Sequence, residues 1–169
     1  MKSRIGGIMA DAIKFNPGRN MKADTFEKYM KDNDLNFFRR RDVHDQKDSV
    51  AFITAIPAGS HRLVAAVITD NSMYTLLRIH LGVAPTGPAR KTFIRFLGQL
   101  NDAHSIFKYT IAEDDNTFLD ICVTTRPGSF DPEVIRTSLN LIIFHLKDNY
   151  EDIARRLSKP GDASDGFEL

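Results

Sequence analysis

Apolar side chains recur at helical spacing between Ala89 and Asp102. Steps of three and four residues place these side chains on one face of a helix, while the basic and amide side chains fall elsewhere. The apolar members are Phe93, Phe96, Leu97 and Leu100. Strand-like segments lie on both sides of this stretch. We therefore expect the helix to cover a sheet whose strands come from both sides of it in the sequence.

Alternating apolar and polar positions predict the strands of that sheet. Four of them precede the helix, at residues 36–43, 50–57, 62–69 and 73–81, and short turns join them, which is typical of an antiparallel meander. The third is apolar at odd and even positions alike, which indicates a central strand. After the helix, residues 105–112 and 117–125 flank a polar loop and predict a hairpin.

Two more helices are predicted. The first spans Ala23 to Asn33, with Asp24 or Thr25 as its cap. The second begins after Asp131, with Pro132 at its first position, and runs to about residue 157.

The middle of the last helix, residues 141–144, is apolar all round, so we expect cover on more than one side. The sheet supplies one side, and a subunit partner, the first helix or the N-terminal segment supplies the rest. The candidate partner-binding residues are Leu139, Ile142, Ile143, Leu146 and Tyr150.

These elements predict an α+β protein with an antiparallel sheet covered by helices, in the order α-β-β-β-β-α-β-β-α. Breakers at Asn16-Pro17-Gly18 separate an N-terminal arm, residues 1–18, from a single domain at residues 19–157. Residues 158–169 are rich in Gly, Asp and Ser and predict a disordered tail.

Composition narrows the function classes. A formal net charge of +1 argues against a strongly basic nucleic-acid binder, so nucleic acid is an unlikely partner. A single cysteine, Cys122, excludes an internal disulfide and a cysteine-based metal cage. The sequence contains neither an export signal nor a stretch long enough to span a bilayer, so we expect a cytoplasmic protein without a membrane partner.

The stretch from Gly82 to Thr92 resembles a phosphate-binding loop only superficially. The residue after its second glycine is Pro88, which provides neither the lysine nor the backbone N–H that such a loop uses on phosphate. A weaker hypothesis is that the following helix N-terminus attracts an anion, with Arg90 and Lys91 as the candidate residues.

No side-chain combination reaches the level of a catalytic or metal site. Asp42, His44, Asp45 and Asp48 are close in sequence, but a solvated turn explains them better than a metal site does. His145 lies in the apolar middle of the last helix, where a hydrogen-bonded interior or interface role is expected. We therefore predict a protein that is not an enzyme and that has no cofactor.

The element order resembles that of the YbjN family and, more widely, the type III secretion chaperone-like fold. The residues that carry the resemblance are Phe96-Leu97-Gly98-Gln99-Leu100-Asn101, which look like a helix ending in an asparagine, the hairpin from Phe107 to Val123, and the helix from Pro132 to Leu157. The resemblance implies a non-enzymatic protein, often a dimer, that binds a protein segment or acts in regulation.

Two functional hypotheses follow. The first is a chaperone-like protein-binding module that acts as a homodimer. The alternative is a small-molecule or anion-sensing regulator that uses the loop from Gly82 to Arg90.

Overall fold

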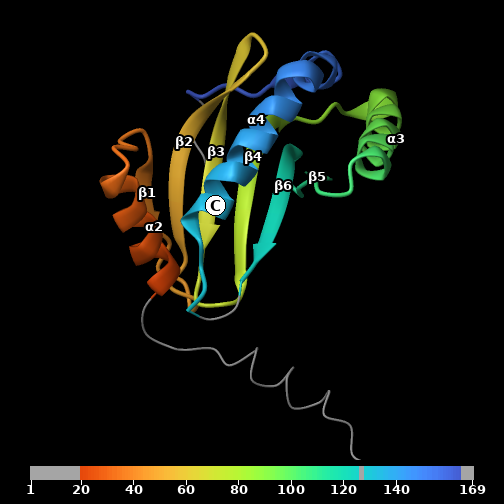
Figure 1. Ribbon diagram of the computed structural model, residues 1–169. Helices are drawn as coiled ribbons and strands as arrows, with labels where there is room; N and C mark the ends of the chain where they lie inside the picture. The colour runs from red at the N-terminus through yellow and green to blue at the C-terminus, as the bar shows by residue number, and fades with distance from the viewer. Residues whose placement is uncertain (1–19, 126–127, 165–169) are drawn as a thin grey trace, which may run out of the picture.

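The computed structural model describes residues 20–125 and 128–164, and these residues form one antiparallel sheet with three helices (Figure 1). The predicted α+β class and element order are confirmed, with one short strand added at the end. The elements are α2 (Met21–Asp32), β1 (Arg39–Asp42), β2 (Val50–Ala58), β3 (His61–Thr69), β4 (Tyr74–Val83), α3 (Gly87–Ala103), β5 (Lys108–Ile111), β6 (Asn116–Thr124), α4 (Pro132–Ala154) and β7 (Lys159–Pro160). The predicted N-terminal arm lies outside the described residues.

The sheet order is β1-β2-β3-β4-β6-β5, with β7 paired to β4 off this path. The predicted meander accounts for β1 to β4, and the predicted hairpin adds β6 and β5 in register from Lys108 opposite Asp120 to Ile111 opposite Thr117. The apolar strand β3 lies inside the sheet, as its sequence predicted, with buried side chains from Leu63 to Val67.

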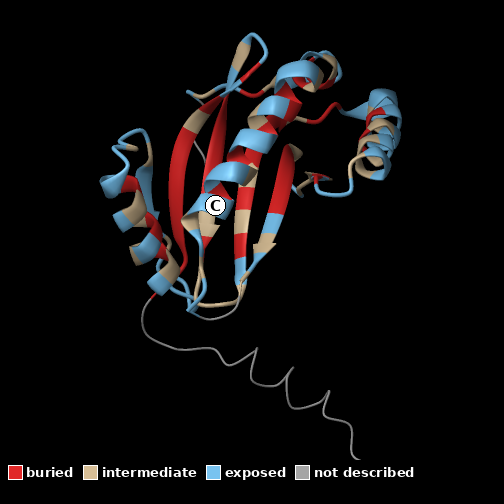
Figure 2. Ribbon diagram, viewed as in Figure 1, coloured by how far each residue is buried: buried red, intermediate tan, exposed pale blue. Residues whose placement is uncertain are grey.

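All three helices pack their buried side chains into one core on the same face of the sheet. Figure 2 shows the buried side of α4 turned toward the strands that it crosses. Asp131 caps α4 as predicted, accepting a hydrogen bond from the Glu133 N–H at 2.9 Å. From α2, Phe26 meets Phe52 of β2 edge to face, with ring centroids 5.0 Å apart. α2 and α4 are joined by a hydrogen bond of 2.7 Å from the Tyr29 hydroxyl to Glu133.

The cap of α2 differs from the prediction. Asn20 rather than Asp24 or Thr25 begins the helix, and its side chain accepts a hydrogen bond from the Ala23 N–H at 3.0 Å. The same amide donates to the carbonyls of Asp48 and Thr69. An asparagine satisfies both sets of groups because its amide carries an acceptor and two donors.

The helix α3 does not cover the sheet in the way its sequence suggested. Figure 1 shows it standing beside the β5 end of the sheet, while α4 crosses the strands. Phe93 and Leu97 are buried, whereas Phe96 and Leu100 are only partly buried. A narrow stripe suffices at this position because only one side of α3 meets the body.

The predicted disordered tail is wrong for its first residues, because residues 158–161 pair with β4. Ser158 and Gly161 donate their N–H groups to the carbonyls of Val83 and Leu81, at 2.9 and 2.8 Å. Two glycines permit this approach: a Cβ on Gly82 would lie 2.3 Å from the Lys159 oxygen, and one on Gly161 2.8 Å from the His80 oxygen. No sequence periodicity signals such a short strand. Residues 165–169 lie outside the described chain.

The opposite face of the sheet carries a second, smaller apolar cluster. Its members come from strands alone among the described residues: Ala51, Ile53, Val64, Ala66 and Phe118. Beside them, Arg78 of β4 forms a two-point ion pair with Asp120 of β6, with N–O distances of 2.9 and 2.7 Å. The Arg78 guanidinium also lies 4.7 Å from the centre of the Phe118 ring.

Candidate functional site

The residues predicted to bind a partner lie mostly in the core of the single chain. Leu139 is 7% exposed, and Ile142, Leu146 and Tyr150 are 0% exposed. Ile143 is partly buried and packs against the same core. The apolar periodicity of α4 therefore identifies its sheet-facing side, and these four buried side chains are not available on the surface.

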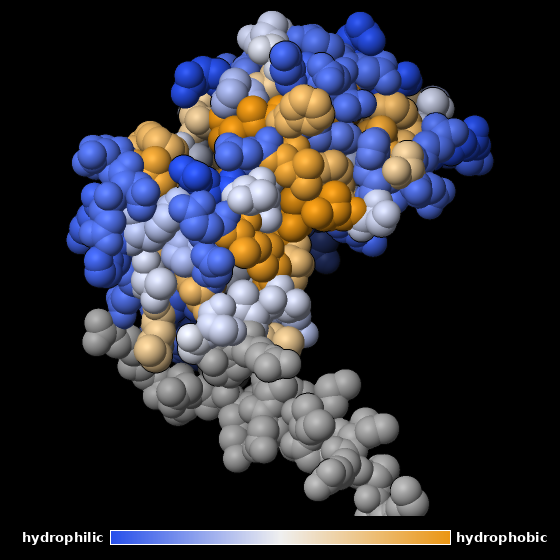
Figure 3. All heavy atoms as spheres, in the orientation of Figure 1, coloured by the Kyte–Doolittle hydropathy of each residue, from blue (hydrophilic) through white to orange (hydrophobic). Residues whose placement is uncertain are grey.

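The exposed apolar side chains of α4 lie on its other side. Val134, Leu141 and Phe144 are 44%, 41% and 68% exposed, and we call these three residues the α4 outer surface. Figure 3 shows apolar side chains gathered in the middle of this side of the molecule, where α4 crosses the sheet. The apolar segment 141–144 predicted cover on a second side of the helix. Its exposed members, Leu141 and Phe144, were not among the predicted site residues, because the three- and four-residue steps in α4 mark its buried side.

A buried polar pair lies one turn along α4 from Leu141, where the helix meets β5 and the end of α3. The Nε2 atom of His145 lies 2.6 Å from the Tyr109 hydroxyl of β5. The His104 ring at the end of α3 lies 4.6 Å from the His145 ring. Burial, and to a smaller extent His104, lowers the pKa of His145 to about 4, so the ring is neutral at physiological pH. This confirms the predicted interior role of His145.

Asn101, near the end of α3, holds β5 in place. Its side-chain oxygen accepts a hydrogen bond from the Tyr109 N–H at 2.7 Å, and its amide group donates to the Tyr109 carbonyl at 3.1 Å. Both backbone groups of one strand residue are thus satisfied by one side chain. The junction of α3, β5 and α4 is consequently fixed by specific polar contacts as well as by apolar packing.

The candidate anion site is occupied by the protein's own charges. Arg90 forms an ion pair with Asp115 at 2.7 Å, and Asp115 also accepts the Ala84 N–H through its backbone carbonyl. Lys91 is exposed, whereas Arg90 is half-buried beside Asp115. Thr86 is the N-cap of α3 and makes no side-chain capping bond.

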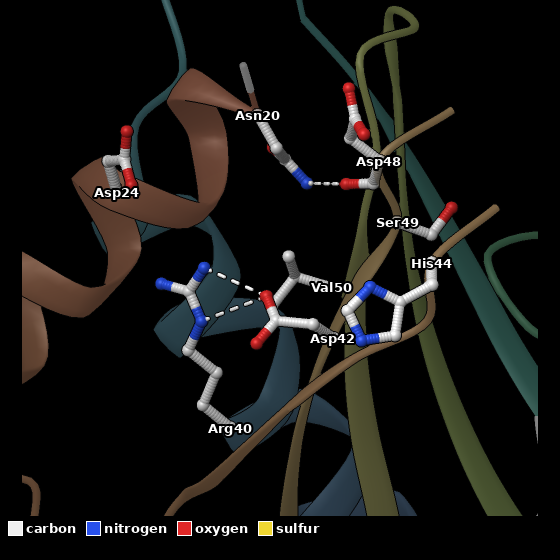
Figure 4. Close-up of a pocket in the computed structure, with 8 residues that line it drawn as sticks. All are labelled: Asn20, Asp24, Arg40, Asp42, His44, Asp48, Ser49 and Val50. Atoms are coloured by element: carbon white, nitrogen blue, oxygen red, sulfur yellow. Dashed lines mark hydrogen bonds and ion pairs between the residues drawn. The ribbon is translucent and has the colours of Figure 1, made fainter. Parts of the chain in front are cut away.

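A polar pocket of about 190 Å³ lies between the start of α2 and the β1–β2 loop (Figure 4). Its lining residues are Asn20, Asp24, Arg40, Asp42, His44, Asp48, Ser49 and Val50. Arg40 is held there by Asp42 at 3.0 Å and by Glu27 at 2.6 Å.

The loop beside this pocket is a hydrogen-bonded turn. Asp45 accepts from the N–H groups of Lys47 and Ser49 and from the Ser49 hydroxyl. These hydrogen bonds, chiefly those from Ser49, lower the pKa of Asp45. Within the described residues, no group of three or more His, Cys, Asp or Glu side chains is arranged to hold a metal ion.

Comparisons with known proteins give one similar structure. No protein-family model and no curated protein matches the chain. The chain is similar to a chain of the heterodimeric ExoU–SpcU complex from the type III secretion system of Pseudomonas aeruginosa, with 21% sequence identity and a TM-score of 0.42, over 63% of this chain and 83% of that chain. This is the type of secretion system named in the sequence resemblance, whereas the narrower resemblance to the YbjN family stays a prediction.

None of the helices in the described part of the chain has the length and hydrophobicity needed to cross a bilayer.

Proposed function

We propose that this chain is a non-enzymatic, chaperone-like module that binds a polypeptide segment through the α4 outer surface. The observation that carries the proposal is the exposure of Val134, Leu141 and Phe144 on a helix whose other side is fully packed. A contiguous exposed apolar surface of this kind marks an interaction site more often than an isolated exposed side chain does. Phe144 is its most exposed member and is the expected anchor.

The surface suits an apolar segment better than a charged ligand. His145, one turn from Leu141, is neutral, and its Nε2 atom is already paired with the Tyr109 hydroxyl. The buried His145–Tyr109 pair therefore adds no charge beside the apolar surface. Burying one large apolar side chain contributes about 1.5–3 kcal/mol, which is roughly tenfold or more in affinity.

Binding of fluorescently labelled apolar peptides, followed by anisotropy, tests the proposal. Phe144→Glu should weaken binding by about tenfold or more, because it places a charge in the apolar contact. Asn140→Glu changes an exposed polar residue of the same helix and is the matched control. Equal affinities of the two variants, or no peptide binding by the unaltered chain, would contradict the assignment.

The working form that we propose is a homodimer, in which two copies cover part of each other's α4 outer surface. Sedimentation velocity at micromolar concentrations should give a dimer for the unaltered chain and a monomer for Leu141→Glu. A monomer at all concentrations, together with no affinity for apolar peptides, would exclude both parts of the proposal.

The alternative, a regulator that senses a small molecule or an anion, has weaker support, because Asp115 already neutralises Arg90. A thermal-shift screen of nucleotides and metabolites separates the two functions. A specific ligand raises the melting temperature in a concentration-dependent manner.

A further inference from the structure

The outer edge of β6 is open over the second half of the strand. β5 pairs with β6 only as far as Lys108 opposite Asp120, whereas β6 continues to Thr124 (Figure 1). The chain before Lys108 is a turn that leads back to α3. We call residues 121–124 the β6 overhang. On its inner side the overhang is fully paired with β4, up to Tyr74 opposite Thr124.

Hydrogen bonds at the two ends of β6 show which residues direct their backbone groups outward. On the inner side, the Thr125 N–H donates to the Met73 carbonyl, at the end of β4, at 2.9 Å. On the outer side, the Asn116 carbonyl accepts the Ala112 N–H, at the end of β5, at 2.8 Å. These directions alternate along an antiparallel strand. The even-numbered residues of β6 therefore direct their N–H and C=O groups to the outer edge.

Two residues of the β6 overhang present free backbone groups for this reason. Cys122 and Thr124 are both exposed. Within the described part of the chain, the outward N–H and C=O groups of these two residues have no hydrogen-bond partner. A row of such groups is a template on which another extended chain can pair.

The other edges of the sheet are protected in ways that the β6 overhang is not. The edge strand β1 consists of four exposed, charged residues, Arg39–Asp42, and charges discourage pairing at an edge. β2 extends beyond β1, but Pro57 in this extension has no N–H to donate. In β5, Asn101 occupies both backbone groups of Tyr109. The β6 overhang has no proline and no charged side chain, so it is the edge best suited to an added strand.

The core side of the β6 overhang is apolar. Ile121 is 4% exposed, and Val123 is partly buried against the core. Val134 and Leu141 of the α4 outer surface lie seven positions apart, and His145 follows four positions later, so the three share one flank of α4. His145 contacts β5, and this flank therefore faces the β5–β6 side of the sheet. An added strand would direct every second side chain toward this apolar region.

The other side of the β6 overhang is wet and polar. Cys122 and Thr124 direct their side chains to the face of the sheet opposite the helices, next to the ion-paired Asp120. Small or polar side chains of an added strand suit this side. Four residues span about 13 Å, and a dimer interface ordinarily takes about 20–30 residues from each partner. A short extended segment is therefore a better occupant than a second folded copy.

We propose that an extended segment of a partner polypeptide adds to the sheet as a strand beside the β6 overhang, hydrogen-bonded to the backbone of Cys122 and Thr124. Its apolar side chains alternate with polar ones and pack beside Ile121 and Val123, on the side of the α4 outer surface. The inference rests on the proposed function and specifies the backbone conformation and side-chain pattern of the bound segment.

A selectively methylated peptide tests the added strand. The probe is a fluorescently labelled peptide of alternating valine and threonine, with a lysine at each end for solubility. When the valines face α4, the threonine N–H groups face β6. N-methylation of two threonine nitrogens should therefore weaken binding by about tenfold or more. N-methylation of two valine nitrogens is the matched control and should change the affinity less than about twofold. Equal losses, or a loss from the valine nitrogens alone, would overturn the proposal.

Amide hydrogen exchange, followed by NMR, locates the bound peptide on the chain. Saturating peptide should slow the exchange of the Cys122 and Thr124 amides several-fold. The Val123 amide, which faces β4, is the internal control and should change little. Protection of the Cys122 and Thr124 amides before peptide is added would contradict the proposal, because the edge would then be occupied by this chain or by a second copy.

The two measurements also separate this inference from the proposed function. Peptide binding that Phe144→Glu weakens, without slower exchange at Cys122 and Thr124, would leave the α4 outer surface as the binding site and overturn only the added strand. Absence of any binding by the alternating peptide and by other apolar peptides would overturn both.

Discussion

α3 and α4 carry apolar stripes of the same periodicity, yet they occupy different places in the molecule. α4 crosses the sheet and buries eight residues, whereas α3 stands beside the sheet and buries only Phe93 and Leu97. The difference lies in what the stripe meets. A helix on a sheet contacts several strands, while a helix beside the last strand contacts little else. Periodicity therefore identifies the packed side of a helix and leaves open the layer that it packs on.

The largest effect is expected on α4. Leu146→Ala should lower the free energy of unfolding by about 4 kcal/mol, because Leu146 is 0% exposed and the surrounding core cannot close the cavity. Urea denaturation followed by circular dichroism measures the change. Leu141→Ala on the exposed side of the same helix is the control and should change stability far less. Equal losses would mean that α4 has no distinct packed side.

A matched pair on α3 comes next. Phe93→Ala should cost about 3 kcal/mol, since Phe93 is 2% exposed, whereas Phe96→Ala should cost about 1 kcal/mol. Phe96 is only partly buried, and the Arg156 guanidinium lies 4.3 Å from its ring centre. The same denaturation measurement applies. A larger loss of stability for Phe96→Ala than for Phe93→Ala would mean that α3 packs on the rest of the domain through the side that carries Phe96.

The contact between His145 of α4 and the end of α3 should weaken in acid. Folding lowers the pKa of His145 from 6.5 to about 4, so the unfolded chain takes up a proton in this range and the folded chain does not. The contribution of His145 to stability is complete above pH 6.5 and is lost as the pH falls toward 4, by on the order of 2 kcal/mol. Unfolding measurements between these pH values should show a shallower slope for His145→Gln. An unchanged dependence of the unfolding free energy on pH would mean that a group other than His145 causes the acid sensitivity.

The smallest effect concerns the attachment of α3 to β5. Asn101→Ala removes two hydrogen bonds to the Tyr109 backbone and should cost about 1–2 kcal/mol, because both backbone groups lose their partner. Hydrogen exchange of the Tyr109 amide should accelerate, while the Leu119 amide of β6 keeps its protection. Rapid exchange at both positions would indicate loss of the hairpin rather than of the attachment alone.

Much of the fold was predictable from the sequence because its signals are local. The alternation in β6, the Asp131 cap of α4 and the polar hairpin loop each depend on neighbouring residues only. The position of α3, the Asn20 cap and the β7 strand depend on residues distant in sequence. Gly82 and Gly161, for example, acquire their roles only when the two segments meet.

The candidate site was harder to predict than the fold. The pattern in α4 that marks Leu139, Ile142, Leu146 and Tyr150 is the signature of a buried side, and a core satisfies it as well as a partner does. Phe144 becomes informative only once the sheet-facing side of the helix is known.

The Asn101 contact also limits how copies of this sheet can join. An antiparallel edge strand pairs with an added strand through the N–H and C=O groups of alternate residues. In β5 both of these groups of Tyr109 are already bonded to Asn101. A strand that adds there must first displace the asparagine. Polymerisation of sheets requires two open edges per copy, and closure of one edge ends growth after a single pairing event. The hydrogen bonds from Asn101 to the Tyr109 backbone therefore oppose fibre-like growth of the sheet through its β5 edge.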